Sequence, residues 1–420
     1  MKTKKFWLVV FFFTAVVVYA WLMSALLDGN SPLSLRQLNR LFASLGFWFF
    51  FLQFVLSSRL KLIESGFGLN VMIHYHRLLG RLALIFLLLH PLLLFINEGG
   101  LFLSSPFRLT GLTVLLLLLL TAFVASFYKK LKLSYELWLN IHKVNYILFP
   151  VVLIHVFYNA SPGSLLYYLW LIISLLFALL LIEKAIREIT IRNNPYEVVK
   201  IQQESKDTWS LYFKGKQFAF KPGQFMYLRL LRKGKLSSSH PFTISSSPTW
   251  ELLTVTPKEL GDFTGTIKET EIGDLALIDA PYGVFSFLNY ECDRLAFIAG
   301  GIGITPFMSM LRYIYDHKIE KQVTVIWGNK DEEALCFQEE LNKMALEMKN
   351  IEVIYVMSAQ ESWRGEKGRI DGKVIEKYVP DLAGCHFFLC GPPMLSLAVM
   401  KALREKGVPD KRIHHELFEL

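Results

Sequence analysis

Cysteine is rare in this 420-residue sequence, and the first 291 residues contain none. The four cysteines form neither a C-x-x-C pair nor a C-x-x-C-H motif, which excludes a zinc ribbon and a covalently attached c-type cofactor. The calcium-loop pattern D-x-[DN]-x-[DN]-G is also missing, which excludes an EF-hand. Thiols confined to the second half of the chain suit a reducing compartment such as the cytosol.

Charged residues are sparse in long stretches of the first half, where six apolar segments are each long enough to cross about 30 Å of hydrocarbon. The sequence therefore predicts a bundle of six transmembrane helices. The expected spans lie near residues 6–27, 41–58, 75–96, 109–128, 137–158 and 165–183.

Lysine and arginine are concentrated in alternate connections between these segments. When the N-terminus is placed inside, the inner connections contain eleven of them and the outer connections three. The positive-inside rule then predicts a multi-pass protein of the cell (plasma) membrane with both termini in the cytoplasm. This clustering also explains the net charge of +9 without a nucleic-acid partner. The inner group is Lys2, Lys4, Lys5, Arg59, Lys61, Lys129, Lys130, Lys132, Lys184, Arg187 and Arg192, and the outer group is Arg36, Arg40 and Arg108.

The second half reads as soluble protein of two kinds. After Pro195, short alternating strands with Gly, Pro and Ser turns, such as 217–230 and 252–257, predict a small β-barrel. From Arg294, strands and helices alternate as in a doubly wound α/β domain. We expect strands at 295–299, 323–327, 353–356 and 387–390, and helices from Pro306, around 332–348 and from Pro393. The predicted domains are a six-helix transmembrane domain at 1–190, a β-barrel at 195–288 and an α/β nucleotide-binding domain at 292–420.

Four histidines lie in the apolar segments as two pairs, His76 with His90 and His142 with His155. Ionisable side chains inside a membrane span are costly and usually mark a site, and neutral imidazole is a common axial ligand of haem iron. His76 and His90 are fourteen residues apart, which places them about 21 Å apart along a helix and on the same face of it. Thirteen residues leave the second pair about 140° apart on a straight helix, so we expect Pro150 to kink that span. The expected depths in the membrane match for His76 and His142, and for His90 and His155. This match predicts that each pair supplies the metal ligands of one of two stacked haems.

Two segments of the expected barrel carry polar groups suited to a flavin. The first presents an imidazole, hydroxyls and backbone N–H groups along a strand, and the second is expected to open a short helix whose N–H groups can bind a pyrophosphate. A plain polar strand and an ordinary helix cap are the open alternatives. The segments are His240-Pro241-Phe242-Thr243-Ile244-Ser245 and Gly261-Asp262-Phe263-Thr264.

Two strand-to-helix turns of the expected α/β domain carry the other candidates. Glycines let the backbone approach a phosphate without a Cβ clash, with Thr305 as N-cap and Pro306 in the first helical turn. The alternative is a tight turn without a ligand. The second turn puts the thiol of Cys390 at the carboxyl end of a strand, where such sheets bind ligands. After the strand at 323–327, Asn329 and Lys330 can meet a ribose 2′-phosphate. The turns are Gly300-Gly301-Ile302-Gly303-Ile304-Thr305-Pro306 and Cys390-Gly391-Pro392.

In their order and spacing, these motifs resemble those of the NADPH oxidase and ferric reductase transmembrane superfamily, over nearly the whole chain. The resemblance implies a two-haem bundle followed by a ferredoxin–NADP reductase-like module. It implies two b-type haems on the four histidines, FAD on 240–245 and 261–264, and NADPH (or NADH) on the two glycine turns. The role of Lys330 is predicted from its position alone, and a merely solvated side chain is the open alternative. Thr243 would lie near the isoalloxazine, Cys390 beside the nicotinamide, and Phe418 over the flavin, as the catalytic positions. The motifs are the two histidine pairs, HPFTI, GDFT, GGIGITPF and CGPPM.

The function that this resemblance implies is electron transfer from cytosolic NADPH, through FAD and the haems, to an acceptor outside the cell. Only Asp28 and Glu98 supply carboxylates to the outer connections, which favours O2, with superoxide as product, over a metal ion. A ferric or metal-chelate reductase with the same path is the alternative. A transporter with a nucleotide-sensing tail is disfavoured, because the spans show no interrupted helices. No docking tail is evident, so no obligate cytosolic activator is expected.

Overall fold

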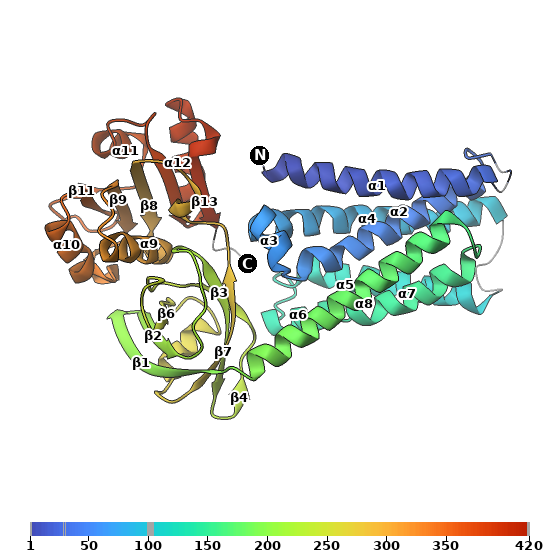
Figure 1. Cartoon of the computed structure of the whole chain (residues 1–420), viewed down its shortest axis with the longest axis horizontal. Helices are drawn as coiled ribbons and strands as arrows, with labels where there is room; N and C mark the ends of the chain where they lie inside the picture. The colour runs from blue at the N-terminus through green and yellow to red at the C-terminus, as the bar shows by residue number, and fades with distance from the viewer. Residues whose placement is uncertain (1, 28, 30, 99–104, 418–420) are drawn as a thin grey trace. The chain divides into compact units, whose positions relative to one another are not determined.

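A computed structural model describes residues 2–27, 29, 31–98 and 105–417 of the chain. The chain divides into two compact units, Met1–Glu188 and Ile189–Leu420, each with its own hydrophobic core. The first unit is helical, and the second contains two β-sheets with flanking helices (Figure 1). The three-domain boundaries expected from the sequence stay a prediction.

Six helical segments among the described residues are long and apolar enough to cross a membrane, which confirms the predicted bundle. The fifth segment consists of two helices, and a short helix that the sequence did not predict, α3 (Lys61–Phe67), precedes the third. The spans are formed by α1 (Lys2–Leu27), α2 (Leu35–Ser57), α4 (Leu69–Glu98), α5 (Pro106–Phe127), α6 (Tyr135–Lys143) with α7 (Asn145–Asn159), and α8 (Leu165–Arg192).

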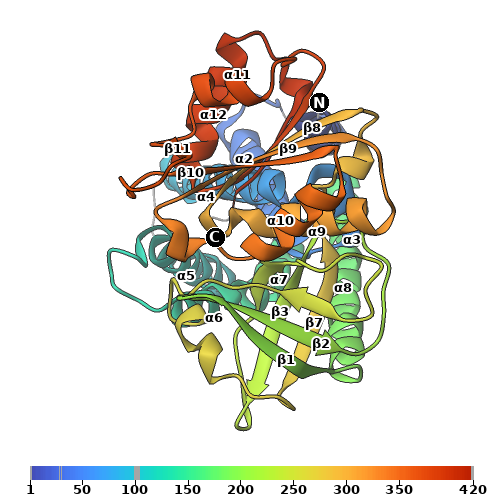
Figure 2. The ribbon, with the colours of Figure 1, turned by 90° about the vertical axis from the view of Figure 1, so that its left-hand side faces the viewer.

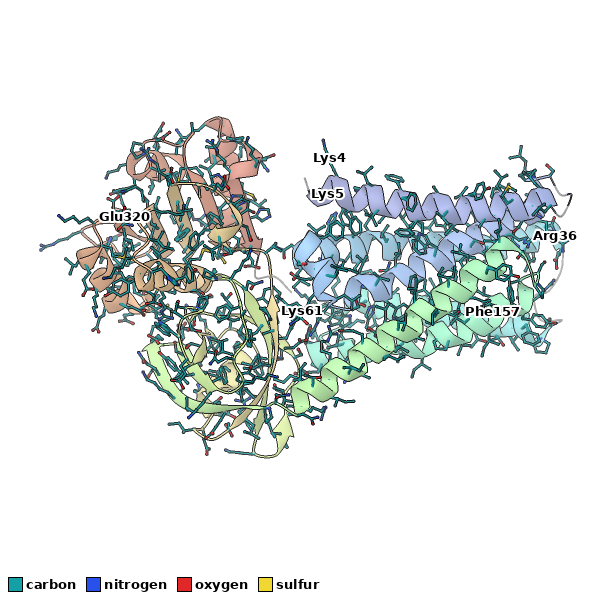
Figure 3. All side chains as sticks on the ribbon, in the orientation of Figure 1. Lys4, Lys5, Arg36, Lys61, Phe157 and Glu320 are labelled. Atoms are coloured by element: carbon teal, nitrogen blue, oxygen red, sulfur yellow. The ribbon has the colours of Figure 1, made fainter. Side chains whose placement is uncertain are left out.

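Labelled residues show how the ends of the helical unit are arranged. Lys4, Lys5 and Lys61 lie at one end of the bundle, and Arg36 and Phe157 lie at the opposite end (Figure 3). Residues from α1 and α3 thus share an end, and residues from the start of α2 and the end of α7 share the other. This arrangement follows from helices that cross in alternating directions.

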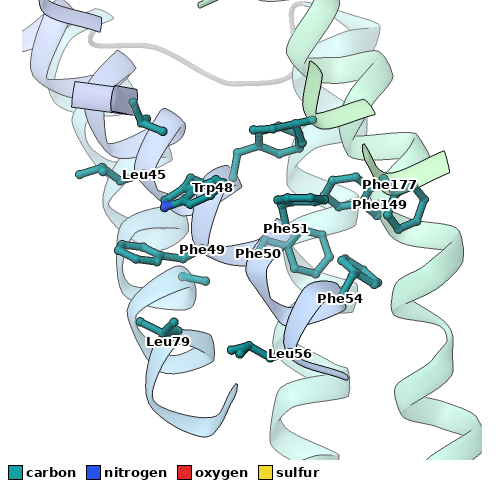
Figure 4. Packing of buried hydrophobic residues seen from close by; sticks show 14 of the residues in the cluster. Leu45, Trp48, Phe49, Phe50, Phe51, Phe54, Leu56, Leu79, Phe149 and Phe177 are labelled. Carbon is teal, nitrogen blue, oxygen red and sulfur yellow. The ribbon is translucent and has the colours of Figure 1, made fainter. Parts of the chain in front are cut away.

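The core of the helical unit is aromatic, and it surrounds Phe149 of α7 (Figure 4). The Phe149 ring lies 5.3 Å from Phe47 and 5.0 Å from Phe54, both on α2, and 4.4 Å from Phe177 on α8. Helix association in lipid depends on close packing rather than on the exclusion of water. These ring contacts therefore hold α2, α7 and α8 together and give α7 a defined position.

The first part of the second unit is an antiparallel barrel with strand order β4-β3-β7-β1-β2-β6. Strand β5 pairs with β3, and the bridge between Ile244 and Val255 joins it to β6 and closes the barrel. The strand expected at 217–230 begins only at Phe225, because Pro222 and Gly223 form a turn. The strands are β1 (Tyr196–Ser205), β2 (Thr208–Lys214), β3 (Phe225–Arg232), β4 (Lys235–Leu236), β5 (His240–Thr243), β6 (Leu253–Val255) and β7 (Leu275–Tyr282).

The last part is a parallel sheet of order β11-β10-β9-β8-β12-β13, which confirms the predicted doubly wound α/β fold. Helices α9 (Thr305–Asp316) and α10 (Gln338–Glu347) cover one face, and α11 (Gly372–Tyr378) and α12 (Pro393–Glu405) cover the other (Figure 2). The strands are β8 (Arg294–Gly300), β9 (Gln322–Asn329), β10 (Ile351–Met357), β11 (Glu366–Lys367), β12 (His386–Gly391) and β13 (Ile413–Leu417).

The helix expected around 332–348 is interrupted in the structure. A 3₁₀ turn, Glu332–Ala334, begins at Asp331, whose carboxylate accepts the N–H of Ala334 at 3.1 Å. Phe337 then adopts a left-handed φ of 62°, and α10 begins after it. A left-handed conformation is unfavourable for a side chain of this size, so surrounding contacts must stabilise it.

Candidate functional site

His76 of α4 and His142 of α6 face each other within the bundle. Their ring centroids lie 6.0 Å apart. A metal–imidazole bond is about 2 Å long, so two imidazoles on opposite sides of one metal have centroids roughly 6 Å apart. The Nδ1 atoms of both rings are buried and have no hydrogen-bond partner among the described residues. The distance fits a pair of axial ligands.

The second pair, His90 and His155, is oriented by oxygen acceptors. His90 Nδ1 lies 2.5 Å from Asn39 Oδ1, and His155 Nδ1 lies 2.9 Å from the carbonyl oxygen of Phe107. An oxygen beside Nδ1 favours the tautomer with its proton there, which leaves the Nε2 lone pair available to a metal. A Cβ atom at Gly111 would come within 2.6 Å of the His155 ring, so glycine makes room for it. Sequence reasoning missed Asn39 and Gly111, because Asn39 lies before the expected span at 41–58 and Gly111 is a single glycine in an apolar run.

The span that carries His142 and His155 is broken at Val144, between α6 and α7, so the expectation that no span is interrupted was wrong. The side chain of Asn145 donates to the carbonyl oxygen of His142 at 2.9 Å and accepts from the Thr121 hydroxyl at 3.2 Å. These bonds replace part of the helical hydrogen bonding at the break. Pro150 lies inside α7, and the kink expected there stays a prediction. Because the helix is broken between them, His142 and His155 are not held at the angle of about 140° that a continuous helix would impose.

The two candidate flavin segments of the barrel lie together. The His240 ring on β5 stacks on Phe263 at 4.2 Å, with the ring planes 13° apart. The Thr243 hydroxyl is buried and has no hydrogen-bond partner in the part of the chain that the structure describes. Arg232, which sequence reasoning missed, lies 5.8 Å from the Phe263 ring. A buried hydroxyl and a nearby guanidinium suit the polar edge and the phosphates of FAD.

Other groups that were predicted to contact the flavin already form hydrogen bonds inside the barrel. The N–H groups of Leu260 and Gly261 both donate to Thr264 Oγ1 at 3.0 Å, in the turn before the 3₁₀ helix Thr264–Glu269. The Ser245 hydroxyl bonds to Thr256 at 3.0 Å. A pyrophosphate contact at 261–264 and a flavin contact at Ser245 stay predictions.

The glycine turn after β8 packs against the turn after β12. A Cβ atom at Gly303 would come within 2.3 Å of the Cys390 carbonyl oxygen, and one at Gly391 within 2.9 Å of the Gly300 nitrogen. Gly301 differs, because its φ is +53° and a Cβ there would meet no described atom within 4 Å. Glycine is therefore required by backbone packing at Gly303 and Gly391, whereas Gly301 faces open space where a ligand can approach.

The first residue of α9 is Thr305, and the N-cap is Ile304. The Thr305 hydroxyl donates to the carbonyl oxygen of Ile302 at 3.1 Å instead of capping the helix. The prediction that Thr305 is the N-cap was therefore wrong by one position. Pro306 does lie in the first helical turn, as predicted.

A Gly303→Ala substitution is expected to lower the thermal unfolding temperature more than Gly301→Ala does. The added methyl group at 303 meets a backbone carbonyl that cannot move alone, and such overpacking costs about 1–3 kcal/mol. At 301 the cost is the left-handed backbone alone, about 1–2 kcal/mol. Flavin fluorescence of the full-length FAD-loaded protein during heating measures both. Equal unfolding temperatures for the two variants would contradict the packing role of Gly303.

Cys390 lies fully buried on β12. Burial, and then the carboxylate of Glu416, raise the pKa of its thiol well above the usual range, so the thiol is neutral. Glu416 is the direct neighbour of Cys390 on β13. Sequence reasoning missed Glu416, because no pattern marked the strand at the end of the chain. Phe418 lies outside the described residues, and its role stays a prediction.

These groups share one edge of the sheet. Gly300, Asn329 and Gly391 end β8, β9 and β12, which run parallel, and Lys330 follows Asn329 with an exposed side chain. The chain leaves β8 toward β9 and returns to β12 on its other side, so the strand order reverses beside β8. Open α/β sheets bind ligands in the crevice at such a switch point.

Three known protein families match this chain, in the same order along it as the helical unit, the barrel and the parallel sheet. Residues 42–153 match the family described as ferric reductase like transmembrane component. Residues 186–286 match an FAD-binding domain, and residues 297–401 match an oxidoreductase NAD-binding domain. This is the domain architecture of the NADPH oxidase and ferric reductase superfamily. The chain is accordingly a multi-pass membrane oxidoreductase with FAD- and NAD-binding domains.

Individual relatives match about half of this chain. The glycine betaine monooxygenase reductase subunit of Pseudomonas aeruginosa is 29% identical over 230 residues, 52% of this chain and 63% of that protein. NADH-cytochrome b5 reductase 1 of Mortierella alpina is 30% identical over 190 residues, 44% of this chain and 64% of that protein. The chain thus spans less than two thirds of the length of these relatives.

Among solved structures, a flavohemoglobin from Malassezia yamatoensis with bound FAD and heme has a similar fold. Its TM-score is 0.51 at 23% identity, over 76% of this chain and 85% of that one. At this identity, the likeness shows a shared fold alone.

Proposed function

We propose that this membrane oxidoreductase carries electrons from cytosolic NADPH to O2 on the outer side of the cell membrane and releases superoxide. The observation that carries the proposal is the pair of histidine sites along one bundle, with rings 6.0 Å apart at the first and oxygen-held Nδ1 atoms at the second. A ferric-chelate reductase is the second candidate, favoured by the match to the ferric reductase like component.

In this proposal, His76 with His142 and His90 with His155 hold two b-type haems. Asn39 and the carbonyl of Phe107 keep the second pair in the tautomer that a metal requires. When bound, FAD converts the two-electron chemistry of a nicotinamide into single-electron steps, and haems carry single electrons between the two faces.

On the nucleotide side, the open position at Gly301 leaves space for phosphates of the dinucleotide. The neutral Cys390 thiol would place no charge beside the nicotinamide, and Thr243 has a free hydroxyl for the flavin edge. Phe418 is proposed to cover the flavin.

The preference for NADPH over NADH is assigned to Lys330, which is exposed beside the end of β9. Its ammonium group would attract the ribose 2′-phosphate, and removal of that attraction affects NADPH alone. We expect Lys330→Ala to lower the NADPH-to-NADH ratio of kcat/KM by about tenfold, a loss of roughly 1.4 kcal/mol. An unchanged ratio would remove the assignment.

The outer ends of the helices support O2 over a free metal cation. Glu98 forms an ion pair with Arg108 at 2.6 Å, so its carboxylate is already neutralised. The other acidic residue of these connections, Asp28, lies outside the described residues. A small neutral acceptor needs no carboxylate, whereas a hard cation prefers oxygen ligands.

The test is reduction of cytochrome c by the purified full-length protein, loaded with FAD and haem and supplied with NADPH, with and without superoxide dismutase. We expect dismutase to abolish most of the signal. A dismutase-insensitive signal that persists without oxygen, and that added ferric chelate suppresses, would replace the oxidase by the chelate reductase. Protein that binds FAD but no haem would contradict both.

A further inference from the structure

One face of α4 carries basic side chains within a membrane-spanning helix. His74, Arg77 and Arg81 are exposed at spacings of three and four residues, so they form a stripe. The stripe continues toward the other end of α4 with Ile85, Leu88 and Leu92, which are 50%, 45% and 51% exposed. The opposite face is buried through Met72, Tyr75, Leu79 and Ala83.

This stripe does not face the histidine pairs. At about 100° per residue, Arg81 lies about 140° around the helix from His76 and about 180° from His90. The two arginines therefore point away from the interior of the bundle. They face the surroundings of the helical unit, where lipid lies.

The position of the arginines along α4 places them near a membrane surface. Thirty residues of helix are about 45 Å long, roughly 15 Å more than the hydrocarbon core. If this excess of about ten residues lies at the start of α4, the core boundary falls near residue 79, with Arg77 just outside it and Arg81 just inside it. A long arginine side chain can extend from such a depth to the headgroups.

Neither arginine has a hydrogen bond or ion pair with any residue that the structure describes. Two acidic groups of the helical unit pair with other arginines: Glu98 with Arg108, and Glu183 with Arg187. Two guanidinium groups one turn apart, about 6 Å along the axis, can both reach a single phosphodiester. The apolar continuation of the stripe matches an acyl chain.

We propose that this stripe binds one anionic phospholipid, with its phosphate between Arg77 and Arg81 and an acyl chain along Ile85, Leu88 and Leu92. The proposed topology puts this lipid in the cytoplasmic leaflet, where negative lipids attract basic residues. A second copy of the chain is a poorer occupant, because a two-fold interface through the stripe would bring like charges together.

The test titrates the full-length, FAD- and haem-loaded protein in detergent with phosphatidylglycerol, and in parallel with phosphatidylcholine, and counts bound lipids by native mass spectrometry. We expect one phosphatidylglycerol to bind more tightly than any phosphatidylcholine. The double variant Arg77→Gln/Arg81→Gln is expected to bind it roughly thirtyfold more weakly, at about fivefold for each arginine. Haem and flavin absorption confirm that each variant is folded and loaded.

The matched control is Lys129→Gln/Lys130→Gln, which removes the same charge from the turn after α5 and should leave the affinity unchanged. A variant that keeps the charge, Arg77→Lys/Arg81→Lys, should retain binding within roughly threefold of the unaltered protein. Equal affinity for the two lipids, equal weakening in the control, or loss in the lysine variant would overturn the proposal. So would a change from dimer to monomer in the glutamine variant, which would identify a second copy as the occupant.

Discussion

A His142→Ala variant is expected to bind one haem instead of two and to stop passing electrons to the outer acceptor. One imidazole of the pair 6.0 Å apart is then missing, and His76 alone cannot ligate both sides of an iron. Loss of an outer-shell partner of a metal ligand already costs about 10–100-fold in affinity or activity, and loss of the ligand itself should exceed this. Reduction of FAD by NADPH should persist, because it depends on the second unit.

The haem content per protein, measured as the pyridine haemochrome, checks this expectation together with the rate of cytochrome c reduction. His74→Ala is the matched control, since His74 lies on the exposed face of α4 and belongs to neither pair. The control should keep two haems. Two haems in the His142→Ala protein, or one in the control, would contradict the assignment of the inner pair.

The second large effect concerns Arg312 on α9, which joins the two parts of the second unit. Its guanidinium donates to both carboxylate oxygens of Glu340, at 2.7 and 2.5 Å, and to the carbonyl oxygen of Ser245 at 2.7 Å. It also lies 4.6 Å from the ring of Trp250 and 5.0 Å from that of Phe337. The group is almost fully buried. The contact between the Arg312 guanidinium and the Phe337 ring helps to explain why Phe337 keeps its left-handed backbone.

Arg312 therefore connects the strand that ends in Thr243 with the helix that begins at the glycine turn. The Ser309 hydroxyl adds a parallel bond to the carbonyl of Ser246, at 2.8 Å. These bonds hold the proposed flavin and nicotinamide sites at a defined separation. Arg312 thus acts as a positioning residue for the proposed reduction of FAD.

An Arg312→Met variant is expected to lose about 1–3 kcal/mol of stability, because it removes the charged hydrogen bonds to Glu340 and to the Ser245 carbonyl oxygen. Unfolding followed by flavin fluorescence measures this, and stopped-flow reduction of FAD by NADPH should slow while the affinity for NADPH is retained. The double variant Arg312→Met/Glu340→Gln should recover part of the stability, since no charge is then left unpaired.

Arg294→Met is the matched control. Arg294 forms an ion pair with Asp381 at 2.8 Å, but both side chains are about half exposed. Exposed pairs contribute about 0–1 kcal/mol, so this variant should resemble the unaltered protein. Equal losses in the Arg312 and Arg294 variants would show that burial of the Arg312 pair is not what stabilises the unit.

The features that depend on one local pattern could be read from the sequence. The length of an apolar segment predicts a span, and the alternation of strands and helices after Arg294 predicts a parallel sheet. Other features depend on tertiary register. The pairing of Glu416 with Cys390 requires β13, and the contact between Asn39 and His90 joins two helices far apart in sequence. The break at Val144 depends on a side chain, Asn145, whose partners lie on α5 and α6.

Because Gly303 is required by packing, the presence of its glycine motif in another protein is weaker evidence for activity than for the fold. Because Gly303 and Gly391 are held against neighbouring backbone, a descendant that no longer used a nicotinamide would still have to keep them in order to fold. Selection on activity alone acts most directly on Gly301. Most of this glycine signature therefore records ancestry of the fold, and a match to it in another genome does not by itself imply a working reductase.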